Sequence, residues 1–413
     1  MPMLYWVSDM PNGLIVQKYG GSSLSSPDRI RHVAERIAVR AADGCRVVVA
    51  VSAMGSSTDE LLKLAYEITP TPPQRELDML LTVGERISMA LLSMALNSLG
   101  CRAISFTGSQ SGIVTSVSHT RALIEEIRGH RIEESLANGQ VVIVAGFQGV
   151  SRTREITTLG RGGSDTSAVA IAASLGARRC EIYSDVPGVF TADPRIVKSA
   201  KRLPRVSYDE MLELAVQGAK VLHYRAAELA RRYRVPVDLL SSFEGSEGTT
   251  VRDGRNMERE CVTGVTSNKH VTLVRLSATG EGTVLADLLR QMVDEDLRII
   301  SYQRNTRGPE SSLTLVVEPD AAERIAELVG GLLEDGLEIG AEKNLSSVSV
   351  VGSGLSCSAR TIARIEGVLA NTGISVPYVG TSTLSVTCLV PEASREEAVG
   401  ILHSALVETD KTL

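Results

Sequence analysis

Apolar residues follow two alternating patterns between residues 14 and 240. Short unbroken runs, such as 47–51 and 141–145, contain only aliphatic residues, which is typical of strands covered on both faces of a sheet. Between such runs, residues 27–40 place their apolar side chains at the spacing of one helix face. Strands that alternate with helices pair in parallel, so we expect a mainly parallel sheet flanked by helices, an α/β fold.

The same patterns predict the other elements of this region. We expect strands at 14–17, 181–186 and 235–240, and helices at 57–68, 79–99, 208–216 and 222–233. Residues 57–60, Ser-Thr-Asp-Glu, match a capping box that would begin the second helix, and Gly100 stands where a helix C-cap is expected. Ligands bind such sheets beyond the carboxyl ends of the strands, which is where a site is expected.

Near residues 244–255 the composition changes to glycine, serine, threonine and charged residues, which indicates a domain boundary. Beyond it the chain contains a weak internal repeat. Each copy has a strand, a helix, two strands and a further helix; the strands are expected at 271–274, 297–300 and 312–317, and at 348–351, 373–376 and 383–390. Two βαββα(β) modules are the simplest interpretation, and an unrelated α+β packing is the alternative.

Composition narrows the function classes. The 413 residues exceed one typical domain, 43% of them are hydrophobic and only 3% are aromatic, so an aliphatic core is expected. The net charge is −6 with acids and bases interspersed, and the absence of a basic block argues against nucleic acid binding. An anionic substrate would therefore need cations concentrated locally.

Six scattered cysteines form no CxxC pair, and the six histidines do not cluster. This pattern favours free thiols in a reducing cytoplasm and no metal site. Residues 1–10 lack the features of a signal peptide, and no apolar run is expected to span a bilayer. A cytoplasmic protein that contacts no membrane is expected.

The most informative stretch is residues 157–167, Thr-Thr-Leu-Gly-Arg-Gly-Gly-Ser-Asp-Thr-Ser. It places Arg161 and Asp165 around Gly162 and Gly163, where a ligand or another backbone can approach closely. Ser164 and the residues after it suit a helix N-terminus, which favours anions. An ordinary glycine-rich strand-to-helix turn is the structural alternative.

A second glycine turn follows Lys18 in Lys-Tyr-Gly-Gly-Ser-Ser, residues 18–23. Backbone N–H groups at Gly20 and Gly21 could cradle phosphate while Lys18 adds a point charge. The turn is not a Walker A loop, and no protein-kinase motif set occurs. A purely structural turn stays open here too.

Further polar groups end strands or begin helices, and each has an ordinary explanation when taken alone. They are Ser52, Thr58, Glu85, Ser184, Asp185, Asp193 and Lys220. Glu85 is typical of a solvated helix residue, and Lys220 of a surface lysine. Together with Lys18, Arg161 and Mg²⁺ they provide what phosphoryl transfer from ATP to a small zwitterionic acid requires, which is mainly positioning and charge neutralisation.

Six motifs in order carry a resemblance to the aspartate kinases of the amino acid kinase superfamily. They are residues 18–23, 51–55 (Val-Ser-Ala-Met-Gly), 84–90 (Gly-Glu-Arg-Ile-Ser-Met-Ala), 146–150 (Gly-Phe-Gln-Gly-Val), 157–166 and 191–195 (Thr-Ala-Asp-Pro-Arg). The likeness covers residues 14–251. It implies an amino acid kinase domain at 1–253, followed by α+β ACT domains of ferredoxin-like fold at 254–342 (with a linker) and 343–413.

The resemblance also implies the reaction: transfer of the ATP γ-phosphate, with Mg²⁺, to the β-carboxylate of L-aspartate, the first step of the aspartate-family amino acid pathway. By position, the nucleotide would contact Lys18, Gly20, Gly21, Ser52, Ser184, Asp185, Phe190, Arg195, Lys220 and Val221. Aspartate would contact Thr58, Glu85, Arg161, Gly162, Gly163, Ser164 and Asp165. Lys18, Arg161, Asp165 and Lys220 would act in catalysis.

The resemblance further implies lysine or threonine as ACT effectors and a homodimer or higher oligomer. Met257 lies near where some relatives begin a separately translated regulatory subunit. Family members commonly have tyrosine at Phe190 and threonine at Ser184. Gln303 and Asn305 are candidate effector contacts, but residues 277–282 and 380–386 depart from the family pattern, so feedback by lysine and threonine is expected to be weak, altered or absent.

Two alternatives come from different classes. One is another kinase of the superfamily, of the glutamate 5-kinase type. The other is a non-catalytic ACT protein that senses amino acids; the retained charges at Lys18, Glu85, Arg161, Asp165 and Lys220 argue against it.

Overall fold

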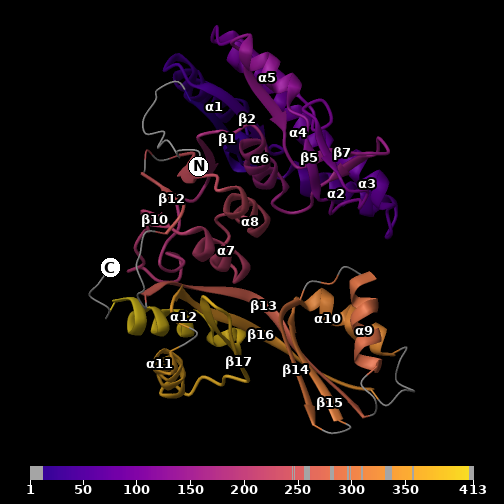
Figure 1. The fold of residues 1–413 in the computed structure, drawn as a ribbon, viewed down its shortest axis with the longest axis vertical. Helices are drawn as coiled ribbons and strands as arrows, with labels where there is room; N and C mark the ends of the chain where they lie inside the picture. Colours follow the sequence, from indigo (N-terminus) through magenta and orange to yellow (C-terminus); the bar gives the residue numbers. More distant parts are fainter. Residues whose placement is uncertain are drawn as a thin grey trace, which may run out of the picture. The chain divides into compact units, whose positions relative to one another are not determined.

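The structure is a computed structural model that describes residues 13–243, 245, 247–254, 261–279, 283–294, 297, 299–307, 310–330, 337–355 and 358–408. It divides into two compact units (Figure 1). The first runs to Val189 and includes Arg202–Ala215 and Lys220–Arg255; the second contains Phe190–Lys201, Val216–Ala219 and the chain from Asn256. The predictions for residues 1–10 and for Met257 lie outside the described residues, and the domain limits at 253 and 342 stay predictions.

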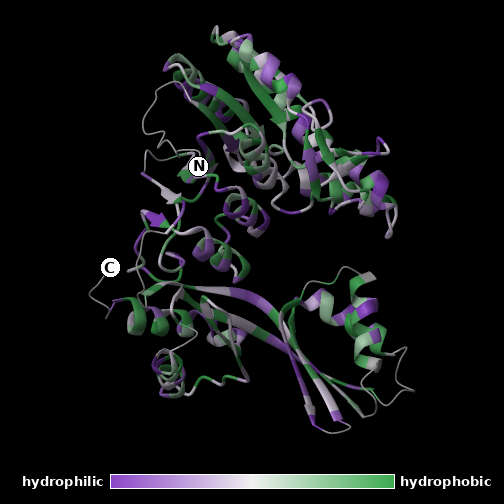
Figure 2. Cartoon of the chain, viewed as in Figure 1, coloured by the Kyte–Doolittle hydropathy of each residue, from purple (hydrophilic) through white to green (hydrophobic). Residues whose placement is uncertain are grey.

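The first unit is built on an eight-stranded sheet in the order β10-β12-β11-β9-β1-β2-β6-β3. Its strands are β1 (Leu14–Tyr19), β2 (Arg46–Val51), β3 (Ala103–Phe106), β6 (Val141–Ala145), β9 (Arg179–Ser184), β10 (Arg205–Val206), β11 (Val237–Ser241) and β12 (Thr249–Val251). Every pair is parallel except β11 with β12. This confirms the predicted mainly parallel sheet, whose central strands are coloured as hydrophobic in Figure 2.

Helices cover both faces of this sheet. The helices of the first unit are α1 (Pro27–Ala42), α2 (Ser57–Ile68), α3 (Gln74–Leu81), α4 (Val83–Ser98), α5 (His130–Ala137), α6 (Gly163–Ser174), α7 (Tyr208–Val216) and α8 (Tyr224–Tyr233), with the short η1 (Gly21–Leu24). Helices α1 and α4 pack on the face that carries Ile15, Val47 and Val49. Side chains alternate along a strand, so Lys18 points to the other face, and it contacts α6 there.

A second sheet of the first unit has four short strands in the order β5-β4-β7-β8. They are β4 (Ile113–Thr115), β5 (Ile124–Ile127), β7 (Gln148–Ser151) and β8 (Ile156–Thr158). Strand β8 leads directly into the glycine-rich stretch that precedes α6. The sequence patterns did not predict this small sheet.

Two helix predictions are wrong in detail. Residues 79–99 are not one helix, because α3 ends at Leu81 and α4 begins at Val83; between them the Thr82 carbonyl accepts a hydrogen bond from Gln148 Nε2. The stretch Gln74–Ser98 is nevertheless long and apolar enough to span a bilayer by length and composition alone, contrary to the sequence-based expectation. It carries Asp78 and Glu85, both buried in the first unit, as in a core helix.

The predicted capping box is also wrong. Ser56, and not Ser57, is the N-cap of α2, and its hydroxyl donates to Glu60 Oε1. The Ser57 hydroxyl donates to the Met54 carbonyl instead. The prediction for α8 began two residues early, because His223 is its N-cap and accepts a hydrogen bond from the Arg225 N–H. Gly100, with φ +75°, follows α4 as predicted.

The second unit is a six-stranded antiparallel sheet in the order β14-β15-β13-β16-β18-β17. The strands are β13 (Cys261–Thr279), β14 (Ile299–Arg307), β15 (Glu310–Val317), β16 (Leu337–Ser353), β17 (Tyr378–Thr381) and β18 (Ser385–Pro391). The helices are α9 (Thr283–Asp294), α10 (Pro319–Gly330), α11 (Ala359–Ala370) and α12 (Arg395–His403), with η3 (Glu392–Ser394) and η4 (Ser404–Glu408). Both copies of the predicted repeat have the order βαββα, joined through β13 and β16.

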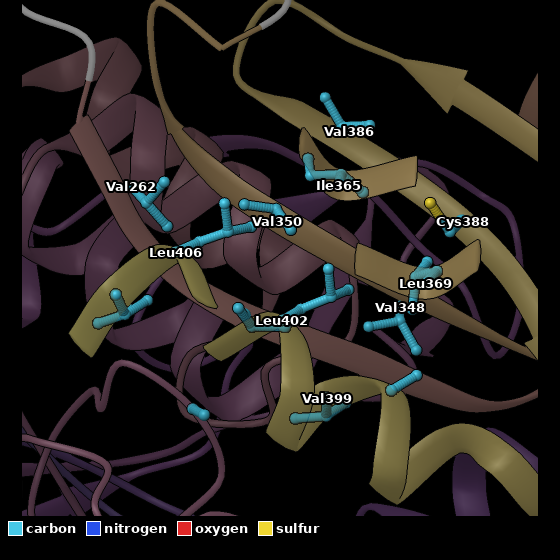
Figure 3. Close-up of a cluster of buried hydrophobic side chains, with 14 of the residues drawn as sticks. Val262, Val348, Val350, Ile365, Leu369, Val386, Cys388, Val399, Leu402 and Leu406 are labelled. Atoms are coloured by element: carbon cyan, nitrogen blue, oxygen red, sulfur yellow. The ribbon is translucent and has the colours of Figure 1, made fainter. Parts of the chain in front are cut away.

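The strand predicted at 373–376 lies at Tyr378–Thr381 instead, after Pro377, which has no N–H to donate to a sheet. Each copy has its own apolar core. The core of the second copy contains Leu402 of α12 with Val348 and Val350 of β16 (Figure 3). Ala192 and Val197 also join this core, which explains why Phe190–Lys201 belongs to the second unit.

We expect Leu402→Ala to destabilise the second unit by about 2–5 kcal/mol, because Leu402 is fully buried and its removal leaves a cavity. A chain of two units need not unfold in one step, so hydrogen exchange of the α12 amides is the suitable measurement. Val293→Ala on α9 is the control, because Val293 is 77% exposed. Equal protection in both variants would contradict the packing described here.

Candidate active site

An ion pair joins the two glycine motifs that the sequence presents separately. Lys18 near the end of β1 and Asp165 in the first turn of α6 approach to 2.7 Å between Nζ and Oδ1. Their side chains are only 11% and 13% exposed. The site is therefore centred where β1 meets the N-terminus of α6, beyond the carboxyl ends of parallel strands.

Two more predicted residues end the strands on either side of β1. Ser52 directly follows β2, and its N–H donates to the Tyr19 carbonyl. Ser184 ends β9, where its hydroxyl bonds the backbone of Val186, and the neighbouring Asp185 is exposed. Because β9, β1 and β2 are adjacent and parallel, Ser184, Lys18 and Ser52 lie together at the carboxyl ends of these strands.

The glycines after β1 are required for close packing. A Cβ at Gly21 would lie 2.9 Å from the carbonyl oxygens of Ala53 and Gly55, and a Cβ at Gly20 would lie 3.3 Å from Lys18 Nζ. Gly21 therefore lets the turn after β2 approach, and Gly20 leaves room for the ammonium. The structural interpretation of this turn is thereby supported, and the phosphate-binding interpretation stays a prediction.

Arg161 lies between two left-handed glycines, Gly160 with φ +75° and Gly162 with φ +68°. Gly162 is the N-cap of α6, and a Cβ there would lie 2.0 Å from Cγ of His223. The Arg161 side chain is exposed, and its guanidinium makes no hydrogen bond or ion pair with the described residues. Its five donors are thus available to a carboxylate.

The start of α6 packs against the turn after β6. Cβ atoms at Gly146 and Gly163 would lie 3.0 Å from Ser164 Oγ and 2.9 Å from Phe147 Cδ2. Phe147 has φ +66°, and its N–H donates to Ser167 Oγ. The sequence did not single out Phe147, although its place in the Gly-Phe-Gln-Gly-Val motif was a signal.

Glu85 is buried, so its interpretation as a solvated helix residue is wrong. It lies in the first turn of α4, where Oε1 accepts a hydrogen bond of 3.0 Å from the Ala53 N–H. Its Oε2 is buried without a hydrogen-bond partner among the described residues. Burial raises the pKa of Glu85 to about 7, and backbone hydrogen bonds oppose this shift. Such a carboxylate would gain from a cationic partner.

A cavity of about 260 Å³ lies between the start of α2 and the start of α4, lined by residues 54–57 and by Ser25, Glu60, Gly84 and Ile87. Thr58 is half-buried in the first turn of α2, directly after the lining segment. The cavity is of a size for a small metabolite, and the lining serines were not predicted.

Other predicted residues are not joined to this site. Lys220 is exposed on the segment before α8, with Val221 beside it, and no hydrogen bond or ion pair connects it to the described residues. Phe190 and Arg195 belong to the second unit. There Arg195 pairs with Asp193 at 2.7 Å, and its hydrogen bonds lower the pKa of that carboxyl.

Gln303 and Asn305 are exposed on β14, an edge strand of the second unit. Two residues apart, they lie on one face of that strand. Among the described residues no group of three or more His, Cys, Asp or Glu could hold a metal ion.

Comparisons with known proteins cover both units. A model of the amino acid kinase family matches residues 13–241, and an ACT domain model matches residues 340–404. The chain is 43% identical over 399 residues to an aspartokinase of Geobacillus stearothermophilus, covering 95% of this chain and 97% of the relative. It is 44% identical over 407 residues to an aspartokinase of Mycolicibacterium smegmatis, covering 95% and 96%.

Among solved structures, E. coli aspartokinase III in complex with aspartate and ADP matches with a TM-score of 0.82 at 25% identity, over 95% of this chain and 99% of that one. The same enzyme in complex with lysine and aspartate matches with a TM-score of 0.72 at 26% identity, over 95% and 99%. The family expected from the six motifs is thereby confirmed: the chain belongs to the aspartokinases.

Proposed function

We propose that the protein transfers the γ-phosphoryl group of ATP to the β-carboxylate of L-aspartate, giving 4-phospho-L-aspartate and ADP. The observation that carries this proposal is the contact between Lys18 and Asp165, which brings a cationic strand end and a glycine-flanked helix N-terminus into one site. Two substrates can meet at such a point. The aspartate and ADP in the complex of E. coli aspartokinase III support the same pair of ligands.

On the nucleotide side, Lys18 and the backbone of Gly20 and Gly21 would contact the phosphates, with Ser52 and Ser184 on the neighbouring strand ends. Asp185 and Val221 would line the same pocket. Lys220 would supply a second cation, and Phe190 and Arg195 stay predicted nucleotide contacts. These last roles rest on the motif resemblance.

ATP would enter as its Mg²⁺ complex. Magnesium in kinase sites is commonly held by substrate phosphates, several waters and one or two carboxylates. Asp165, beside Lys18, is the carboxylate suited to face it.

On the aspartate side, Arg161 would bind a substrate carboxylate and Glu85 would bind the ammonium, with Thr58 beside it. Gly162, Gly163 and Ser164 would place N–H groups of the α6 N-terminus near the acceptor. The acceptor carboxylate is already ionised at neutral pH, so the reaction needs no general base. Catalysis would come from alignment and from cations on the transferring group.

A glutamate 5-kinase type of reaction is the nearest alternative, and relative turnover of aspartate and glutamate separates the two. A non-catalytic amino-acid-sensing protein is the other, and it would show no ATP-dependent turnover with either acid.

Residues 280–282, within the segment that departs from the family pattern, lie outside the described residues. We propose a cytoplasmic homodimer or higher oligomer that contacts neither nucleic acid nor membrane.

Lys18→Ala should reduce turnover by about 10²–10³-fold, because one electrostatic donor contributes about 3–4 kcal/mol to transition-state stabilisation. ATP-dependent aspartyl hydroxamate formation measures this, and a thermal melt checks that the fold survives. Lys63→Ala is the matched control, because exposed Glu67 on α2 is the one ion-pair partner of Lys63 among the described residues. A near-normal rate in the Lys18 variant would remove the proposed role.

The pH profile should report Glu85. Its pKa is about 7 in the free protein, so below that pH it is neutral and cannot pair with the substrate ammonium. We expect kcat/KM for aspartate to rise as pH increases from about 6 to 8, and Glu85→Gln to be less active with a flat profile. An unchanged profile in the variant would assign the titration to another group.

Feedback should be weak, altered or absent, because residues 277–282 and 380–386 depart from the pattern of regulated relatives. Activity is titrated with lysine, with threonine and with both together. Gln303→Ala and Asn305→Ala then test whether any response uses β14. Strong inhibition of the unmodified protein by either amino acid would contradict this expectation.

A further inference from the structure

Thr120 has a backbone conformation that its side chain disfavours. Its φ is +64°, in the left-handed region where a β-branched residue is a genuine outlier. Such strain persists only where surrounding contacts impose it, and it gathers at functional sites. The neighbours of Thr120 therefore show what holds this segment in place.

The fully buried carboxylate of Asp78 on α3 is the first of these neighbours. Its two oxygens accept hydrogen bonds from the Thr120 N–H at 3.0 and 3.2 Å, and Oδ2 lies 2.7 Å from His119 Nδ1. Oδ1 also accepts a 2.6 Å bond from the Thr158 hydroxyl at the end of β8. One buried charge thus joins residues 119–120 to the strand that leads to Arg161.

Arg225 on α8 joins the same two segments through hydrogen bonds that its guanidinium donates. Its guanidinium donates to the carbonyl of Leu159 through Nη1 and to that of Ala122 through Nη2, the latter at 2.9 Å. The Ala122 N–H donates to the Thr158 carbonyl as well. The segments lie so close that a Cβ at Gly160 would be 2.9 Å from the Thr120 carbonyl oxygen.

Arg161 needs such external support. Glycines on both sides leave its backbone free to adopt many conformations, and its guanidinium has no partner among the described residues. The position of Arg161 therefore depends on what fixes the residues on each side of it, and residues 158–160 are those that precede it. On this side of the turn the charged groups that do so are Asp78 and Arg225.

We propose that Asp78 and Arg225 are positioning residues for aspartate binding. Each clamps residues 119–122 against residues 158–160 and so places Arg161 toward its substrate carboxylate. This inference rests on the proposed function, in which Arg161 binds aspartate. Neither residue touches the substrate, so their loss should weaken the use of aspartate while that of ATP, on the strand ends beside Lys18, is retained.

The test compares Asp78→Asn and Arg225→Lys with the unmodified protein. Asparagine keeps the shape of Asp78 but loses the charge and one acceptor, and lysine cannot reach two carbonyl groups as the guanidinium fork does. We expect KM for aspartate to rise about tenfold in each variant, because small displacements of a positioning group are costly. KM for ATP should stay within about twofold.

Glu181→Gln is the matched control. Glu181 on β9 is also a fully buried carboxylate with several donors, namely Gln17 Nε2 at 2.8 Å, the Tyr183 hydroxyl at 3.0 Å and Arg40 at 3.0 Å. None of these donors lies near residues 158–160 in the sequence or bonds to them. The melting temperature of Glu181→Gln should fall as that of Asp78→Asn does. The KM of Glu181→Gln for aspartate should stay within about twofold of the unmodified protein.

If Asp78→Asn does not fold, Thr158→Val removes one donor to Asp78 in a side chain of nearly the same shape, with an expected rise in KM for aspartate of about threefold. An unchanged KM in a folded variant overturns the proposal. An equal rise in KM for ATP also overturns the proposal, and so does an equal rise in KM for aspartate in Glu181→Gln. Either result would reflect a general loss of structure. An unmodified protein without aspartate-dependent ADP formation would refute the proposed function instead.

Discussion

The contact between Lys18 and Asp165 is the interaction on which the geometry of the candidate active site in the first unit depends. A largely buried ion pair contributes little net stability, because desolvation of both groups offsets their attraction. It does impose a geometry: the end of β1 must face the first turn of α6 at 2.7 Å. The flanking strands then bring Ser52 and Ser184 to the same edge, and the turn before α6 brings Arg161. The fold thereby assembles groups from distant parts of the chain.

Sequence reasoning worked where the physical cause was local. The unbroken aliphatic runs of β2 and β6 and the period of α1 are set by burial, so the parallel sheet and its covering helices could be predicted. The βαββα repeat was visible for the same reason. The break at Thr82 could not be predicted in this way, because the group that bonds the Thr82 carbonyl is Gln148, which lies 66 positions along the chain.

The candidate site shows the same division. Lys18, Arg161 and Asp165 stood out because glycines and a helix start surround them in the sequence. Asp78 did not, since a single acid in an apolar helix has no local signal; only the fold brings Thr120 and Thr158 to it. The glycines also allowed two interpretations, a close-packed turn and a ligand-binding turn, which the sequence alone could not separate. Gly21 and Gly162 are explained by backbone and imidazole packing, and this packing also places the groups of the proposed ligand site.

Three carboxylates of the first unit show how environment divides their roles. Asp78 accepts hydrogen bonds from several donors, one of them the backbone N–H of Thr120. Asp165 has the ammonium of Lys18 as its partner instead. Among the described residues Glu85 has N–H groups of the backbone as its only partners, and burial raises its pKa to about 7. Its Oε2 lacks a partner among the described residues. A ligand that carries an ammonium would supply that missing charge, which is the role that we propose for the amino group of the substrate.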